Sequence, residues 1–207
     1  MKRLIDFDSW NRKDHFNFFN QFDNPYFGVT VDIDCTKAYQ ISKELNTSFF
    51  IYYLHKSITA ANNVEAFRYR IIENKVYLYD IINASPTINR ENSPFGFSYI
   101  KYHENFEEFT KIAQKEIKRV QNTMGLDPAT SGENVIHYSS LPWVKFTSLS
   151  HAQNSSFPDS CPKISFGKMT LKNEKRTMPM SVHVHHALMD GFEVGLYIDK
   201  FQELMNQ

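Results

Sequence analysis

The sequence is short of cysteine, of glycine and of long apolar runs. Its two cysteines, Cys35 and Cys161, are too few for a disulfide scaffold and fit a reducing compartment. It contains no G-x-G-x-x-G motif and no Walker loop, which argues against Rossmann and P-loop nucleotide chemistry. The longest apolar run, residues 49–54, cannot span a bilayer, and no apolar signal segment follows Met1. We therefore expect a cytoplasmic protein without a membrane partner.

An excess of charge of one sign is also missing. Lys plus Arg and Asp plus Glu both count 23, which argues against a globally basic nucleic-acid binder. Aromatic residues, in contrast, are plentiful, with 18 Phe, 11 Tyr and 2 Trp. That supply can fill a sizeable core and excludes intrinsic disorder. The chain has 207 residues and neither a linker nor an internal repeat, so we expect one domain over residues 1–207.

The periodicity of apolar residues predicts both strands and helices. Alternation predicts strands at 27–33, 67–72, 76–81, 96–102, 144–149, 164–171 and 178–185. Helical spacing predicts helices over 106–120 and 194–205, and the N-cap residues Asp34 and Ser48 predict two more. A hairpin turn is expected at 73–75, and loops are expected at 82–94, 122–133 and 151–162. The mixture predicts an α/β (α+β) fold, a two-layer sandwich in which helices cover a mixed sheet.

The most informative segment runs from Ser181 to Gly191. It passes from a predicted strand through an Asp-Gly turn into a predicted helix. Strand periodicity places Val182, Val184 and His186 on one face of the sheet. His186 is thus the histidine that ends an apolar face, where a strand meets a loop and catalytic groups are often found.

Three interpretations of these histidines stay open on spacing alone. His186 is a candidate general base, because imidazole titrates near neutrality and can take a proton from a hydroxyl group. His183 and His185 share the other face and form a candidate metal pair, although the local pattern holds no third ligand. The third interpretation gives these histidines no chemical role. Nucleophilic catalysis is less favoured, since there is no G-x-S-x-G elbow and no Cys beside a His.

Three motifs resemble those of one enzyme family and occur in its order. Residues 185–192, H-H-A-L-M-D-G-F, fit H-H-x-x-x-D-G-F, and residues 10–16, W-N-R-K-D-H-F, fit W-x-R-x-x-H-F. Residues 139–148, S-S-L-P-W-V-K-F-T-S, resemble S-x-L-P-W-V-x-F. H-x-x-x-D-G alone is shared by many CoA-dependent acyltransferases. Together, the three motifs resemble the chloramphenicol acetyltransferases from Trp10 to about Leu204.

This resemblance implies direct transfer of an acetyl group from acetyl-CoA to a hydroxyl of chloramphenicol, which would confer antibiotic resistance. His186 matches the family's general base, and Ser139 matches the serine whose hydroxyl stabilises the tetrahedral oxyanion. Asp190 matches a structural aspartate that pairs with the arginine matched by Arg12. The resemblance also implies a homotrimer with each site between subunits, and we expect no bound metal.

The resemblance extends to the two substrate sites. For the acceptor, the matching positions are Phe19, Phe27, Thr87, Phe97, Leu149, His151 and Ser165, and for acetyl-CoA they are Trp143, Lys168 and Met169. Phe19 and Met169 replace tyrosines, and the wall formed by Leu149 and His151 is more apolar in familiar members. Core packing is as good an explanation for Trp143 and the phenylalanines, and strand capping for Ser139. Two alternatives therefore stay open: the same chemistry on a different small alcohol, and a non-catalytic trimer that sequesters its ligand.

Overall fold

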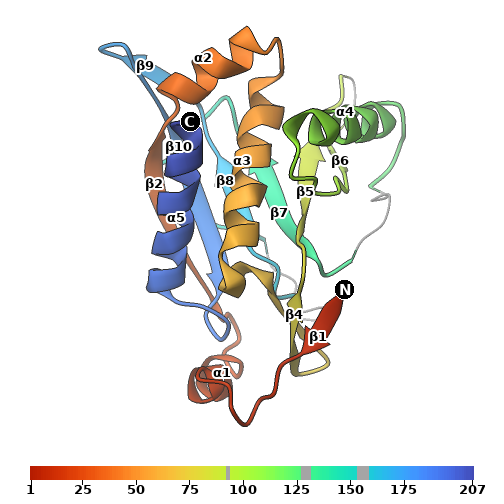
Figure 1. Cartoon of the computed structure of the whole chain (residues 1–207), viewed down its shortest axis with the longest axis vertical. Helices are drawn as coiled ribbons and strands as arrows, with labels where there is room; N and C mark the ends of the chain where they lie inside the picture. Colours follow the sequence, from red (N-terminus) through yellow and green to blue (C-terminus); the bar gives the residue numbers. More distant parts are fainter. Residues whose placement is uncertain (92–93, 127–131, 153–158) are drawn as a thin grey trace.

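The computed structural model describes residues 1–91, 94–126, 132–152 and 159–207, so parts of the three predicted loops lie outside the described residues. A seven-stranded sheet, with helices packed on one face, forms most of the molecule (Figure 1). Its strands follow the order β2 (Tyr26–Asp34), β10 (Lys175–His185), β8 (Lys163–Phe166), β7 (Val135–Ser140), β5 (Asn83–Ile88) and β6 (Gly96–Phe97), with β9 (Thr170–Lys172) paired to β10. The β5–β7 and β7–β8 pairs are parallel and the others antiparallel, so the predicted mixed sheet is confirmed.

A smaller sheet lies at one end, built from β1 (Lys2–Leu4), β4 (Lys75–Tyr79) and β3 (Tyr69–Ile72). The expected hairpin turn joins β3 to β4. Glu73 and Asn74 both adopt positive φ, 50° and 58°, as a two-residue turn between twisted strands requires. The short η1 helix (Glu65–Arg68) takes up the start of the predicted strand at 67–72.

Helices α3 (Phe49–Asn63) and α5 (Gly191–Met205) lie across one face of the large sheet and bury its core, as Figure 1 shows. Leu54, Phe201 and Val182 are fully buried there, and truncating such a phenylalanine to alanine typically costs about 3–5 kcal/mol. The remaining helices are α1 (Lys13–Phe19), α2 (Thr36–Glu44) and α4 (Phe106–Gln121). Within the described residues, no helix is long and apolar enough to cross a membrane.

One buried polar group fixes the helical layer on the sheet. The Ser57 hydroxyl of α3 lies 3.0 Å from the Tyr138 hydroxyl of β7 and 2.7 Å from the Tyr197 hydroxyl of α5. Because an unpaired buried hydroxyl costs about 1–3 kcal/mol, these three groups specify how α3 and α5 sit on the strands. The contacts of Ser57 thereby determine which face of the sheet meets the helices. The opposite face carries polar side chains such as Ser165, Ser181 and Lys163, which are buried.

Several predicted elements differ from the structure. Residues 144–149 form no strand; the strand lies earlier, at β7, where the prediction placed none. β5 falls inside a predicted loop, because its alternate positions are polar and it contains Pro86. The predicted strand at 164–171 is interrupted between β8 and β9, and only 96–97 of the predicted 96–102 is extended. The four predicted helices are present.

Candidate active site

The face of the large sheet that points away from α3 and α5, here called the open face, carries a line of hydroxyl groups. Ser139 of β7 pairs with Ser165 of β8, which pairs in turn with Ser181 of β10. Because Pro86 pairs with Tyr138, the following residue, Thr87, lies level with Ser139. Neighbouring strands are about 4.8 Å apart, so these side chains form one continuous row.

His186 follows the last residue of β10, and four contacts hold it. Its backbone N–H donates to the Pro25 carbonyl at 2.8 Å. Its ring stacks on Phe19 with 3.9 Å between centroids and packs at a tilt against Phe27, with 4.5 Å between centroids. Its Nδ1 lies 3.2 Å from the carbonyl oxygen of Met189. Because a carbonyl only accepts, Nδ1 carries the hydrogen, and Nε2 keeps the lone pair that a general base needs.

The turn after His186 is tied to the N-terminal segment by Arg12. Its Nη1 donates to an Asp190 carboxylate oxygen at 3.1 Å, and its Nη2 donates to the backbone carbonyl of His186 at 3.2 Å. The predicted Arg12–Asp190 ion pair is therefore present. Arg12 holds the backbone of His186 as well as the carboxylate, which links the two sequence motifs that are farthest apart in the chain.

Asp190 also begins α5. Its carboxylate accepts from the Phe192 N–H at 2.9 Å, and its own N–H donates to Glu193 at 2.8 Å, which completes a capping box. The Phe192 N–H, and then Glu193 and Arg12, lower the pKa of Asp190 to about 2. The group is thus ionised at neutral pH and acts as a cap and anchor. It does not touch the imidazole ring, so the arrangement is not a serine-protease triad.

Ser139 and His186 do not come together within one chain. Ser139 lies in the same row as Ser181. His185 is four positions farther along β10, a distance of about 13 Å. Moreover, His186 packs on Phe27, whose partner in the sheet, Val184, faces the helices, whereas Ser139 faces the open side. The proposed base and oxyanion donor are therefore presented on different sides of the sheet, more than about 13 Å apart along the strands.

The acceptor candidates divide between these two places. Phe19 and Phe27 lie against His186. Thr87 pairs with Phe97 at one end of the open face. At its centre, Ser165 Oγ lies 3.4 Å from Nε2 of His151. The seventh candidate, Leu149, is partly exposed in the segment that leads to His151.

The acetyl-CoA candidates lie together at the end of β7 and β8. Trp143 is 70% exposed, so core packing does not explain this residue. The Lys168 N–H donates to the Val144 carbonyl at 2.8 Å, which brings an exposed lysine beside Trp143. Met169 follows Lys168 and packs partly against the core. An exposed indole, a free ammonium and the Ser139 hydroxyl thus occupy one edge of the open face.

The two histidines considered as a candidate metal pair, His183 and His185, have different partners. Nδ1 of His183 is hydrogen-bonded to Ser181 Oγ at 3.0 Å, whereas His185 packs edge-on against the Tyr26 ring. Burial lowers the pKa of both imidazoles, that of His185 to about 4. Both rings are neutral at pH 7.

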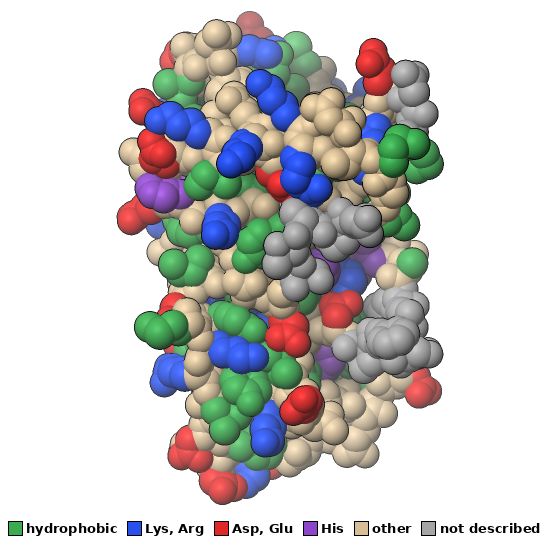
Figure 2. Space-filling model, turned by 90° about the vertical axis from the view of Figure 1, so that its right-hand side faces the viewer, with side chains coloured by type: hydrophobic (Ala, Val, Ile, Leu, Met, Phe, Trp, Pro, Cys, Tyr) green, Lys and Arg blue, Asp and Glu red, His purple; other side chains and the backbone are tan. Residues whose placement is uncertain are grey.

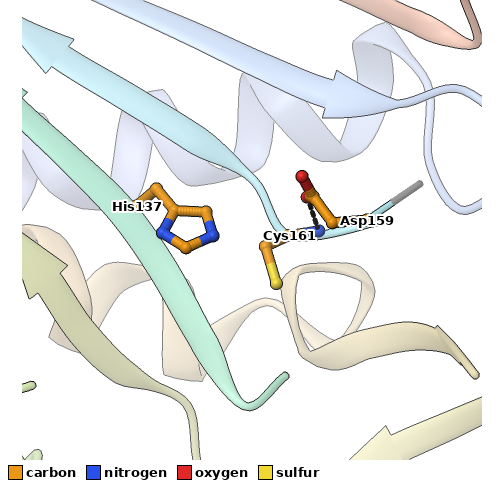
Figure 3. Close-up of side chains that lie close together, drawn as sticks. All are labelled: His137, Asp159 and Cys161. Atoms are coloured by element: carbon orange, nitrogen blue, oxygen red, sulfur yellow. Dashed lines mark hydrogen bonds between the residues drawn. The ribbon is translucent and has the colours of Figure 1, made fainter. Parts of the chain in front are cut away.

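A different group could hold a metal ion. The ligand atoms of His137, Asp159 and Cys161 lie within 4.8 Å of one another, and Figure 3 shows their side chains turned toward a common space. However, the Asp159 carboxylate already accepts from Lys163 Nζ at 3.0 and 3.1 Å and from the Tyr26 hydroxyl at 2.9 Å. The Lys163 ammonium thus already neutralises the carboxylate that a metal ion would bind. The sequence analysis missed this cluster because His137 is brought to Asp159 and Cys161 only by the pairing of β7 with β8.

Comparison with known proteins agrees with this geometry. Residues 2–202 match the family model described as chloramphenicol acetyltransferase. A chloramphenicol acetyltransferase of Proteus mirabilis is 28% identical over 99% of this chain and 94% of its own, and one of Clostridium perfringens is 29% identical over 97% and 93%. A solved structure named chloramphenicol acetyltransferase superposes with a TM-score of 0.90 at 32% identity, covering 99% of this chain and 100% of that one. The chain therefore belongs to the chloramphenicol acetyltransferase family.

Proposed function

We propose that this protein transfers the acetyl group of acetyl-CoA to a hydroxyl group of chloramphenicol and thereby confers resistance to it. The observation that carries the proposal is the bond from His186 Nδ1 to the Met189 carbonyl, which leaves Nε2 free to accept a proton. The proposal treats residues 1–207 as one acetyltransferase domain in the cytoplasm, where acetyl-CoA is available.

The reaction is direct. His186 Nε2 takes the proton of the acceptor hydroxyl while its oxygen attacks the thioester carbonyl, so that a C–O bond forms and the carbonyl oxygen becomes an oxyanion. The Ser139 hydroxyl donates a hydrogen bond to that oxyanion. The C–S bond then breaks, and the CoA thiolate recovers the proton from the His186 imidazolium. Because a thioester has a good leaving group, one base and one oxyanion donor suffice, without an acyl-enzyme and without a metal.

The site is completed by a second copy of the chain. His186 and Ser139 are separated by more than about 13 Å along the sheet and face different sides, so His186 must meet the partner subunit's Ser139. A contact between two different residues is satisfied in every copy by a two-fold dimer or by a closed ring. We propose a homotrimer, the state that the family resemblance implies.

Mixing two inactive variants tests the shared site. His186→Ala and Ser139→Ala should each be nearly inactive alone. Assembled together from denaturant, or by co-expression, they should regain activity, because some sites then combine an intact His186 with an intact Ser139. Mixed assemblies that form, as shown by mass spectrometry, but stay inactive would contradict a site shared between copies.

In this proposal the edge of the open face next to Ser139 binds acetyl-CoA. The Lys168 ammonium is exposed and available to a phosphate group, and the exposed Trp143 indole and Met169 offer apolar contact to the pantetheine arm. Arg12 and Asp190 are positioning residues, since they hold the backbone of the His186 turn without touching the reacting atoms.

The decisive experiment measures thiol release from acetyl-CoA with and without chloramphenicol, together with mass spectrometry of the acceptor. Acceptor-dependent release and an acetylated product would support the proposal, and both should vanish in His186→Ala but survive in the exposed His103→Leu control. Binding of chloramphenicol without thiol release would instead identify a sequestering protein. Thiol release with other small alcohols only would identify a different acceptor.

A further inference from the structure

A second row of side chains crosses the open face beside the hydroxyl row. Ser85 of β5 pairs with His137 of β7, His137 with Lys163 of β8, and Lys163 with His183 of β10. This row lies two residues from the Ser139 row, a distance of about 7 Å. An acceptor whose hydroxyl attacks the thioester beside Ser139 can therefore place its other end against these imidazoles.

The surroundings of this row leave room for imidazole rings and fix their positions. A Cβ atom on Gly28 would lie 2.4 Å from the His183 ring, so the missing side chain at position 28 makes room for this histidine. His183 is also fixed by Ser181 Oγ at 3.0 Å. A third imidazole, that of His151, reaches the same place from outside the sheet. It meets the His183 ring edge-on at 4.9 Å and lies 3.4 Å from Ser165 Oγ.

These groups carry hydrogen-bonding capacity and no net charge. Burial lowers the pKa of His137 and of His183, and it lowers that of His151 to about 4, so all three imidazoles are neutral at pH 7. The Lys163 ammonium is neutralised by Asp159, and Figure 3 places that carboxylate beside His137. In Figure 2, histidine side chains lie next to acidic and basic ones in the right half of the view.

Given the proposed function, on which this inference rests, we propose that His137, His151 and His183, here called the imidazole row, form the distal half of the acceptor site. They favour small, uncharged alcohols that carry further hydrogen-bonding groups on the side of the reacting hydroxyl that faces this row. Polyols and hydroxyl-bearing amides fit this description. A ring at the same place leaves neutral imidazoles and hydroxyls unpaired, so the preference shifts toward polar alcohols relative to chloramphenicol, which remains a substrate.

Chloramphenicol provides one member of a probe pair. It is an N-acylated 2-amino-1,3-propanediol with an aromatic ring on C1, and 2-acetamido-1,3-propanediol keeps both hydroxyls and an amide without the ring. The experiment measures kcat/KM for both acceptors in the wild type, in the double variant His151→Leu/His183→Leu and in His151→Gln/His183→Gln. His103→Leu, an exposed histidine away from the sheet, is the matched control. Thermal melts and acceptor-independent thiol release report on folding and on the acetyl-transfer machinery.

We expect the leucine variant to lower the ratio of kcat/KM for the ring-free diol to that for chloramphenicol by at least about tenfold, the scale of a lost hydrogen-bonding contact in a specificity site. The glutamine variant and His103→Leu should keep this ratio within about threefold of the wild type. An unchanged ratio in a folded leucine variant would overturn the inference. So would a wild type that uses neither acceptor while still releasing thiol in a His186-dependent manner. Absence of all thiol release would overturn the proposed function instead.

Discussion

His186 and Ser139 are presented very differently. The His186 ring stacks on Phe19 and packs against Phe27. Its backbone N–H and its Nδ1 donate to the Pro25 and Met189 carbonyls, and its own carbonyl accepts from Arg12. The serine is placed only by its strand, and within the described residues its hydroxyl makes no hydrogen bond. A base must be fixed in one tautomer before the reaction, whereas an oxyanion donor has to stay uncommitted until the charge develops. This contrast predicts which substitutions act through orientation and which act through one lost bond.

The largest effect is expected from His186→Ala. General bases contribute about 10²–10⁴ in rate, so kcat should fall by that factor or to the background of the assay. The fold should survive, because the ring packs on Phe19 and Phe27 outside the fully buried core. Steady-state kinetics with circular dichroism would show this. Turnover close to that of the wild type would exclude His186 as the base.

Ser139→Ala should cost about 10²–10³ in kcat, with little change in the KM for either substrate, because the hydrogen bond strengthens only as the oxyanion forms. The neighbouring Ser140→Ala is a matched control. Ser140 faces the helical layer, where its Oγ lies 2.8 Å from the Tyr53 hydroxyl. It should therefore change the melting temperature and leave kcat alone. Equal kinetic losses in the two variants would contradict the role of Ser139.

Arg12→Val and Asp190→Asn should each lower kcat by about tenfold, mainly through a misplaced imidazole. Asparagine still caps α5, so the second change isolates the lost charge. If the pair acts as a unit, the double variant loses far less than the sum of the single losses. The exposed pair of Lys13 and Asp8, 2.6 Å apart on the same segment, supplies the control Lys13→Val, which should have no kinetic effect. Additive losses in folded variants would show that the two residues work independently.

The sequence predicted the layers, helices α2 to α5 and the turn at the end of β10, because apolar periodicity dictates which faces are buried, but it did not predict α1. It missed β7, since His137, Ser139 and Ser140 interrupt its apolar pattern. The motif resemblance identified His186, Arg12 and Asp190, and the structure shows their contacts. The resemblance implied a site between subunits, but periodicity could not predict the separation of Ser139 from His186, because that separation depends on the register of three paired strands. The same register assembles the imidazole row from strands that are distant in the chain.

A smaller effect, on stability and not on turnover, is expected from His185. Burial first, and then Lys163 and His186, lower the pKa of this imidazole to about 4, while Asp159 raises it. The unfolded chain, with a pKa near 6.5, binds the extra proton as the pH falls from 6.5 to 4. The free energy of unfolding should drop by about 3 kcal/mol over that range from this group alone.

His185→Gln removes this titration and should flatten the dependence, as urea denaturation at pH 7 and pH 4.5 can show. The exposed His15→Gln is the control and should leave the slope unchanged. A His185→Gln slope identical to that of the wild type would mean that His185 is not buried in its neutral form.

The smallest effect is expected from a chelator. Prolonged dialysis against one should leave turnover unchanged, because the proposed reaction needs only His186 and Ser139. The best donor set, His137, Asp159 and Cys161, is not prepared for a metal ion. Lys163 already neutralises the Asp159 carboxylate, and burial raises the pKa of the Cys161 thiol, so that a metal would have to displace both an ammonium and a proton.

Cobalt(II) sharpens this test, because a cobalt–thiolate bond gives a charge-transfer band in the near ultraviolet. Titration of the wild type should give no such band at stoichiometric metal, and Cys161→Ser should behave identically. A reversible loss of activity on chelation that zinc restores, together with a cobalt band that Cys161→Ser abolishes, would show that this cluster binds a metal after all. The contrast drawn above would then change, since the open face would hold an organised metal centre near the uncommitted hydroxyl of Ser139.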